Sequence, residues 1–290
     1  MTMKYMKIFC LLASLCLTAM TAQAQDVIIS RNTTTTTTST TKPSTRNKPS
    51  RPRPKPRSEP SNPIGEVIYE TFTANGVSFK MIRVEGGTFT MGATSEQGSD
   101  ALDEEKPAHQ VMLSSYYIGE TEVTQGLWQA VMGSNPSSFK GSERPVEQVS
   151  WDDCQIFIHK LNALTGRSFR LPSEVEWEFA VRGGKKSQGY KYSGSNNLSS
   201  VAWYTDNSSS ETHPVKSKSP NELGLFDMNG NVWEWTSNCW RGNYSAPEEC
   251  DKLVIRGGCW YNNYGENRVS RRGWGSAGWH NDGVGFRLAL

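Results

Sequence analysis

Two glycine- and tryptophan-rich stretches near the C-terminus constrain the fold more than any other part of this sequence. Residues 224–235 read GLFDMNGNVWEW, and residues 256–288 begin with Arg-Gly-Gly and end with Gly-Phe-Arg-Leu. Their glycines, tryptophans and charges follow neither the period of a helix nor the alternation of a half-buried strand. We therefore expect an irregular structure in this region, and we expect it to carry the functional site.

The composition agrees with a loop-rich, aromatic core. Hydrophobic residues make up only 36% of the chain, yet it contains ten Trp, ten Tyr and ten Phe. Aromatic side chains bury large areas each, so relatively few of them can form a core. The net charge of +2 argues against a nucleic-acid-binding protein, which normally carries a concentrated basic face.

The first 24 residues have the pattern of a signal peptide. Lys4 and Lys7 precede the apolar run 8–20, and Thr21-Ala-Gln-Ala24 ends it with small residues. The run is too short to span a bilayer comfortably, so the mature chain is expected to lack a transmembrane segment. We predict cleavage after Ala24 and export to the periplasm, the cell surface or the medium. Lipid attachment at Cys16 is the less favoured alternative, because Leu15 precedes it.

Residues 25–63 are predicted to form a disordered linker. This segment contains the threonine run 33–38 and seven prolines among Lys, Arg and Ser. Such a composition cannot bury apolar surface and favours extended conformations. A solvated tether is the favoured interpretation. Attachment to an anionic surface through the basic run 51–57 is the alternative.

Residues 64–290 are expected to form one α+β domain with long loops and little regular secondary structure. Alternating residues predict a strand at 77–83, glycines predict a hairpin at 85–92, and residues 109–118 resemble another strand. Three helices are expected to begin after Thr124, Ser150 and Ser173 and to end at glycines, which are capping signals. The sequence from residue 189 onward contains no convincing helix.

Four cysteines remain after removal of the signal peptide: Cys154, Cys239, Cys250 and Cys259. In an exported protein they are compatible with two disulfides in three possible pairings. Cys239 and Cys250 are close enough in sequence to staple one loop. The other two cysteines would then be a second pair or two free buried thiols.

Several motifs, in this order, resemble the formylglycine-generating enzyme (sulfatase-modifying factor) family. They are Gly86–Gly92, Glu120–Thr124, Pro145–Trp151, Arg170–Glu178, Asn229–Trp235, Arg256–Gly258 and Gly285–Arg287. The resemblance covers residues 77–290. It implies an irregular fold related to C-type lectin domains, often with bound calcium. The enzymes of the family oxidise a cysteine of a sulfatase peptide to formylglycine with copper and oxygen.

The resemblance also predicts that the thiol chemistry is lost. The two cysteines that bind copper and substrate in the enzymes correspond to Asn262 and Asn267, which cannot supply the thiolates that select Cu(I). Copper is therefore not expected. The family pocket is expected to persist as a binding groove in which Asn262 to Asn267 are exposed, whereas Trp260 and Phe286 belong to the core. The predicted groove residues are Trp233, Cys259, Asn262, Asn263, Asn267 and Arg268.

A calcium site is expected from the same resemblance. It consists of the carboxylates of Asp227 and Glu234 and the carbonyl oxygens of Gly230 and Val232, a set of hard oxygen ligands that suits calcium. In the alternative, Asp227 caps the turn and Glu234 pairs with an arginine such as Arg287. The family's second calcium site is not expected, because Val201 and Ala202 stand where an asparagine would be required.

Three functions are compatible with these features. The favoured one is an exported family member without oxidase chemistry that binds a peptide, protein or glycan through the C-terminal groove. The second is a formylglycine-generating oxidase with an altered site that uses Cys259. The third is a structural component of a surface or secretion assembly, tethered by residues 25–63.

Overall fold

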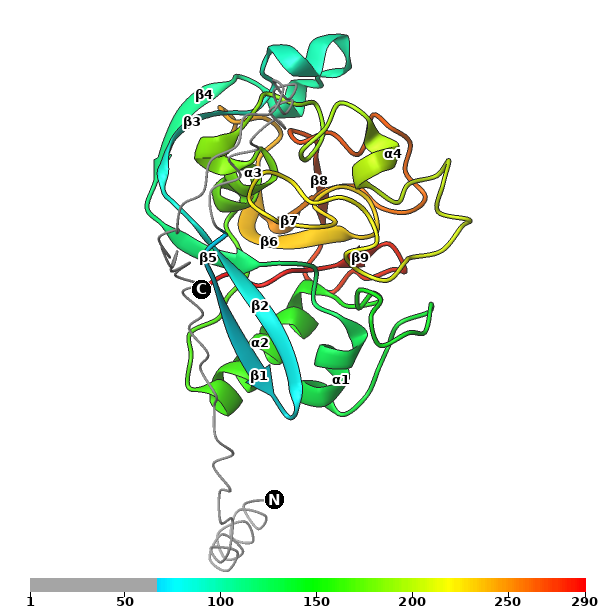
Figure 1. Ribbon diagram of the computed structural model, residues 1–290. Coiled ribbons are helices and arrows are strands. Elements are labelled where there is room, and N and C mark those ends of the chain that lie inside the picture. Colours follow the sequence, from blue (N-terminus) through cyan, green and yellow to red (C-terminus); the bar gives the residue numbers. More distant parts are fainter. Residues whose placement is uncertain (1–66) are drawn as a thin grey trace, which may run out of the picture.

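The computed structural model describes residues 67–290 (Figure 1). The predicted signal peptide and linker lie outside these residues. Between residues 67 and 290, no helix combines the length and the apolar character that crossing a membrane requires.

The N-terminal part of the domain forms two small antiparallel sheets. The first has the strand order β1-β2-β5, and the second pairs β3 with β4. Strands β1 and β2 are joined at Asn75-Gly76, where both residues have positive φ angles of 47° and 83°. The strands are β1 (Tyr69–Ala74), β2 (Val77–Val84), β3 (Gly87–Met91), β4 (His109–Leu113) and β5 (Tyr116–Gly119).

These sheets confirm the predicted strand at 77–83 and correct two other expectations. The hairpin predicted at 85–92 is wrong, because residues 87–91 form a single strand that pairs with β4 and not within 85–92. The single strand predicted at 109–118 is two strands in different sheets, interrupted at residues 114–115. Gly86 lies so close to the backbone at this interruption that an added Cβ atom would overlap the Leu113 carbonyl. The chain therefore changes sheets where only glycine fits.

All three predicted helices are present with the predicted N-caps; the first two end at the predicted glycines, whereas the third ends at Arg182. They are α1 (Gln125–Met132), α2 (Trp151–Thr165) and α3 (Glu174–Val181), preceded by Thr124, Ser150 and Ser173. Each capping side chain accepts a hydrogen bond from the backbone N–H three residues later. The further helical elements are short: α4 (Leu198–Val201) and the 3₁₀ turns η1 (Ser95–Asp100), η2 (Asp103–Glu105) and η3 (Gly184–Lys186).

The C-terminal part contributes a four-stranded sheet with the order β8-β7-β6-β9. Its strands are β6 (Trp233–Trp240), β7 (Glu249–Arg256), β8 (Arg272–Gly275) and β9 (Val284–Gly285). This sheet lies in the middle of the domain, between the α1–α2 layer and the loops around α4 (Figure 1). The sequence did not predict these strands individually, because bulges interrupt the pairing of β6 with β7.

Aromatic residues hold these layers together, as the composition predicts. Trp128 of α1 stacks on Phe157 of α2, and both rings meet the edge of Phe286. Phe286 is fully buried, as expected, whereas Trp260 is only partly buried against Phe139. Residues 288–290 then run beside β5 and residue 170, with backbone hydrogen bonds to both. The C-terminal segment thereby joins the first sheet to the helical layer.

Candidate functional site

The loop 259–268 carries the positions at which the family resemblance predicts asparagines in place of thiols. The Asn262 Oδ1 atom accepts hydrogen bonds from the backbone N–H and the Sγ atom of Cys259, both at 3.0 Å. The Asn267 Nδ2 atom donates to the Asn263 carbonyl at 2.7 Å. Both amides therefore hold the loop closed. Asn263 is exposed as predicted, but Asn267 is fully buried, because its side chain reaches back under the loop.

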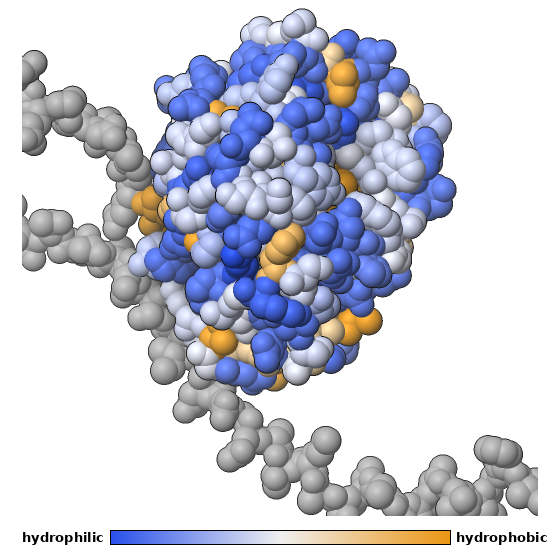
Figure 2. All heavy atoms as spheres, turned by 90° about the vertical axis from the view of Figure 1, so that its right-hand side faces the viewer, coloured by the Kyte–Doolittle hydropathy of each residue, from blue (hydrophilic) through white to orange (hydrophobic). Residues whose placement is uncertain are grey.

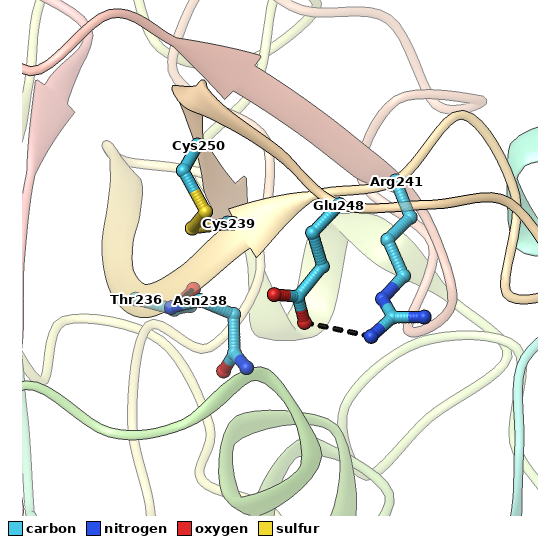
Figure 3. The surroundings of a disulfide bond; sticks show 6 residues. All are labelled: Thr236, Asn238, Cys239, Arg241, Glu248 and Cys250. Carbon is cyan, nitrogen blue, oxygen red and sulfur yellow. Dashed lines mark hydrogen bonds and ion pairs between the residues drawn. A yellow bond between two sulfur atoms is a disulfide. The ribbon is translucent and has the colours of Figure 1, made fainter.

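The cysteines separate into one disulfide and two buried thiols. Cys239 of β6 and Cys250 of β7 form a disulfide across the β6–β7 hairpin, beside the ion pair between Arg241 and Glu248 (Figure 3). Cys154 and Cys259 are both buried and free. Burial raises the pKa of the Cys259 thiol to about 12, so this thiol is not ionised near neutral pH.

Arg268 is a structural bridge beneath the loop. Its guanidinium donates two hydrogen bonds to the Glu105 carboxylate, at 2.7 and 2.5 Å, and its Nε atom donates to the Gly265 carbonyl at 2.9 Å. Ser270 also donates to Glu105. Burial by itself raises the pKa of Glu105, but the hydrogen bonds from Arg268 and Ser270 outweigh it and hold that pKa below its ordinary value.

A shallow hollow of about 330 Å³ lies between this loop and the segment 99–102. Of the six predicted groove residues, Asn263 and Arg268 line it. The rest of its lining consists of Ser99, Asp100, Leu102, Tyr264, Gly265 and Glu266. Trp233 is not part of this lining, because it is buried in the apolar core.

Sequence reasoning missed the wall of the hollow formed by residues 99–102. The surrounding segment 95–106 is acidic and has no apolar periodicity, so it resembles a free loop. Asp100 pairs with Lys191, and flanking residues hold the segment on both sides, where Glu96 pairs with Arg182 and Glu104 with Arg271. The acidic residues of 95–106 indicate that this segment forms ion pairs, but the sequence does not specify which basic residues are the partners.

The predicted calcium ligands lie in a buried, acidic part of the molecule. Asp227 is 2% exposed, and its backbone adopts a left-handed conformation with φ of 55°. Its Oδ2 atom accepts a hydrogen bond from the Lys216 N–H at 2.7 Å, whereas its Oδ1 atom has no partner within residues 67–290. Burial raises the pKa of Asp227 to about 6.

Glu234 pairs with Arg287, as the alternative to a calcium site predicts. Arg287 donates to both carboxylate oxygens at 2.6 Å, and the Trp177 indole donates to one of them at 2.7 Å. Burial by itself lowers the pKa of Arg287, but the charge of Glu234 outweighs this effect and raises it. Of the two predicted carboxylate ligands, Asp227 therefore offers a free oxygen, and Glu234 does not.

A third buried carboxylate, Glu122, was not predicted. It accepts hydrogen bonds from the Asn231 side chain and the Val232 N–H, at 3.1 and 3.3 Å. Burial first, and then the charges of Asp227 and Glu234, raise its pKa well above the ordinary value. The charge of Arg287 lowers the pKa of both Glu122 and Asp227, but burial outweighs it in each case. Burial thus disfavours the ionised forms of Glu122 and Asp227, and a bound cation would stabilise these forms.

Comparisons with known proteins match the whole described domain. The family model described as "Sulfatase-modifying factor enzyme 1-like domain" matches residues 68–290. A chaperone protein LppX from Paenibacillus barcinonensis is 34% identical, over 68% of this chain and 84% of that protein. The inactive C-alpha-formylglycine-generating enzyme 2 of Bos taurus is 26% identical, over 74% and 89% of the two chains.

Two solved structures with the same fold are similar to this chain in sequence as well. Treponema denticola variable protein 1 has a TM-score of 0.69 and 34% identity, over 77% of this chain and 98% of that chain. PvdO from Pseudomonas aeruginosa has a TM-score of 0.63 and 26% identity, over 72% and 93%. These matches agree with the mixed helix and strand content and the long loops described above.

Proposed function

The chain belongs to the sulfatase-modifying factor enzyme 1-like family, and from this premise we propose that it is an exported binding module without oxidase chemistry. Its ligand would occupy the hollow between residues 99–102 and the loop 259–268. Export depends on the first 24 residues, and the ligand is a peptide, protein or glycan.

The proposal rests on the hydrogen bonds that the side chains of two asparagines form within the loop 259–268. Asn262 and Asn267 occupy the positions of the expected copper-binding thiols, and both amides are engaged in closing the loop. An amide offers neither the soft sulfur donor nor the negative charge that a Cu(I) site requires. The two residues therefore stabilise a binding loop instead of holding a metal.

The remaining thiol does not replace the missing pair. Cys259 is fully buried, donates its S–H to Asn262, and has a pKa near 12. A thiol acts as a nucleophile or metal ligand through its thiolate, and burial disfavours that form here. The relatives include a protein whose name describes it as inactive, which is consistent with loss of activity in this family.

We expect no formylglycine formation when the purified protein is incubated with copper, oxygen and a Cys-x-Pro-x-Arg peptide. Mass spectrometry would show the peptide cysteine unchanged, because the thiolate pair is missing. A family enzyme with both cysteines serves as the positive control. Turnover that disappears in Cys259→Ser would contradict the proposal and support the oxidase alternative.

We also propose that a calcium ion stabilises the fold at Asp227. The free Oδ1 atom and the surplus of buried carboxylates support it. The carbonyl oxygens of Gly230 and Val232 would complete the ligands, whereas Glu234 would act through its pair with Arg287. The ion would neutralise buried charge and take no part in a reaction.

Removal of calcium is therefore expected to lower the melting temperature by about 5 °C or more, since a ligand that binds only the folded state stabilises it. Calorimetry with and without a chelator measures the difference. Asp227→Ala should abolish the response, and Asp251→Ala, at an exposed aspartate, should keep it. Equal melting temperatures with and without chelator would refute the calcium site.

A further inference from the structure

The hollow at the loop 259–268 has rigid walls on both sides. Asp100 is fixed by Lys191 at 2.5 Å, Glu266 by Arg271 at 2.9 Å, and Arg268 by Glu105. The contacts of Asp100 and Arg268 join segments far apart in the sequence, whereas Glu266 and Arg271 are near neighbours. The buried pair of Arg268 with Glu105 therefore holds the two walls together before a ligand arrives, which lowers the entropic cost of binding.

The same contacts leave the hollow without an unpaired charge. Asp100, Glu266 and Arg268 are its charged lining residues, and each has an oppositely charged partner within the domain. Asp100 and Glu266 are partly exposed, so a further ion pair with a charged ligand would be screened by solvent, and displacing an existing partner would exchange one pair for another. Exchanging one ion pair for another gives little net binding energy, so the lining disfavours acidic and basic peptides.

The groups that remain available in the hollow are neutral. No partner within residues 67–290 hydrogen-bonds to the Ser99 hydroxyl, the Asn263 amide nitrogen or the Tyr264 hydroxyl. Tyr264 is 58% exposed and presents an aromatic ring at the rim, and Leu102 is 39% exposed. Tyrosine, serine and asparagine together supply a flat apolar surface and adaptable hydrogen bonds.

The face of the molecule drawn in Figure 2 does not favour a broad apolar protein interface. Figure 2 shows the side of the molecule that carries α4, and hydrophobic residues appear there as separate spots among hydrophilic ones. Within residues 67–290, the exposed large apolar residues are spread over β4, α2, β8 and several loops, and Leu102 and Tyr264 are the ones that line the hollow. A stable protein contact would normally require a more continuous apolar centre.

We infer that this hollow binds a neutral saccharide, with one sugar ring stacked on Tyr264 and its hydroxyls hydrogen-bonded to Asn263 and Ser99. The inference rests on the proposed binding function and specifies the ligand class. A sugar ring has an apolar C–H face and a polar edge. It therefore matches an aromatic ring beside amide and hydroxyl groups, and it requires no charge from the protein.

The test is binding of the purified protein to an array of neutral hexose and N-acetylhexosamine oligosaccharides, together with sialylated and sulfated versions and acidic and basic peptides. Calorimetry on the saccharides that bind then compares variants. Tyr264→Ala is expected to weaken binding about tenfold or more, as loss of a central aromatic contact does. Tyr264→Phe keeps the ring and should retain most of the affinity.

Trp274→Ala is the matched control, because Trp274 is an exposed aromatic residue that does not line the hollow. The saccharide affinity of this variant should equal that of the unaltered protein. Saccharide affinity should also change little with salt, because no ion pair forms between the protein and a neutral ligand. Tyr264-dependent binding of peptides or of charged saccharides alone would overturn the saccharide assignment and leave the binding module standing. Absence of Tyr264-dependent binding to every probe would overturn the site itself.

Discussion

Glu234→Gln is expected to lower the free energy of unfolding by about 3–5 kcal/mol, the cost of leaving one member of a buried ion pair without its partner. Glu234 and Arg287 are both fully buried, and the guanidinium bonds to both carboxylate oxygens. Arg287 also donates to the carbonyls of Gly119 and Phe226, so it cannot turn toward water without releasing them. Urea unfolding followed by fluorescence measures the change.

Glu248→Gln provides the control for this prediction. Its pair with Arg241 has a similar distance of 2.7 Å, but the two side chains are 48% and 41% exposed. Solvent screens such a pair, and the expected cost is about 0–1 kcal/mol. The free energy of unfolding of both variants should be measured with and without calcium. The comparison separates the contribution of the ion pair from that of a bound cation. Equal costs for the two variants would contradict the structural account of Glu234.

Arg268→Ala is expected to have an effect of similar size, about 3–5 kcal/mol, because it leaves the Glu105 carboxylate buried without its cation. Arg268 also bonds to Gln97 and to the Gly265 carbonyl. Its loss therefore separates the segment 95–105 from the loop 259–268. We expect faster cleavage within 95–105 by a nonspecific protease, in addition to the loss of stability.

Arg271→Ala tests whether this effect is specific. Arg271 pairs with Glu104 and Glu266 in the same region, but these side chains are partly exposed. Its removal should cost about 1 kcal/mol or less and leave the cleavage rate nearly unchanged. Mass spectrometry of the fragments and urea unfolding measure the two quantities. Equal protection of 95–105 in Arg268→Ala and the unaltered protein would contradict the bridging role.

The sequence predicted the helices well, because their signals are local. Each cap at Thr124, Ser150 and Ser173 depends on a hydrogen bond to a residue three positions away. The disulfide between Cys239 and Cys250 was among the predicted pairings for a similar reason. In both cases the interacting residues are close in the chain.

The walls of the candidate site depend on contacts between distant residues and were not predictable in the same way. Arg268 lines the hollow as predicted, but its buried ion pair with Glu105, which lies far upstream in the sequence, was not predicted. Asn267 was expected to be exposed, and its fold-back onto Asn263 is visible only in three dimensions. Family motifs identify such positions, whereas the direction of each side chain follows from tertiary packing.

The pairing of residues 288–290 with β5 has a consequence for how the domain is made. Backbone hydrogen bonds connect Leu288 and Leu290 to Gly119 and Tyr117, and Ala289 to Arg170. During synthesis, β5 and the helical layer emerge long before these partners exist. The β5 edge of the first sheet therefore stays open until residues 288–290 have been made and have paired with it. Because these partners are far apart in the sequence, closure of the domain is a late step in folding.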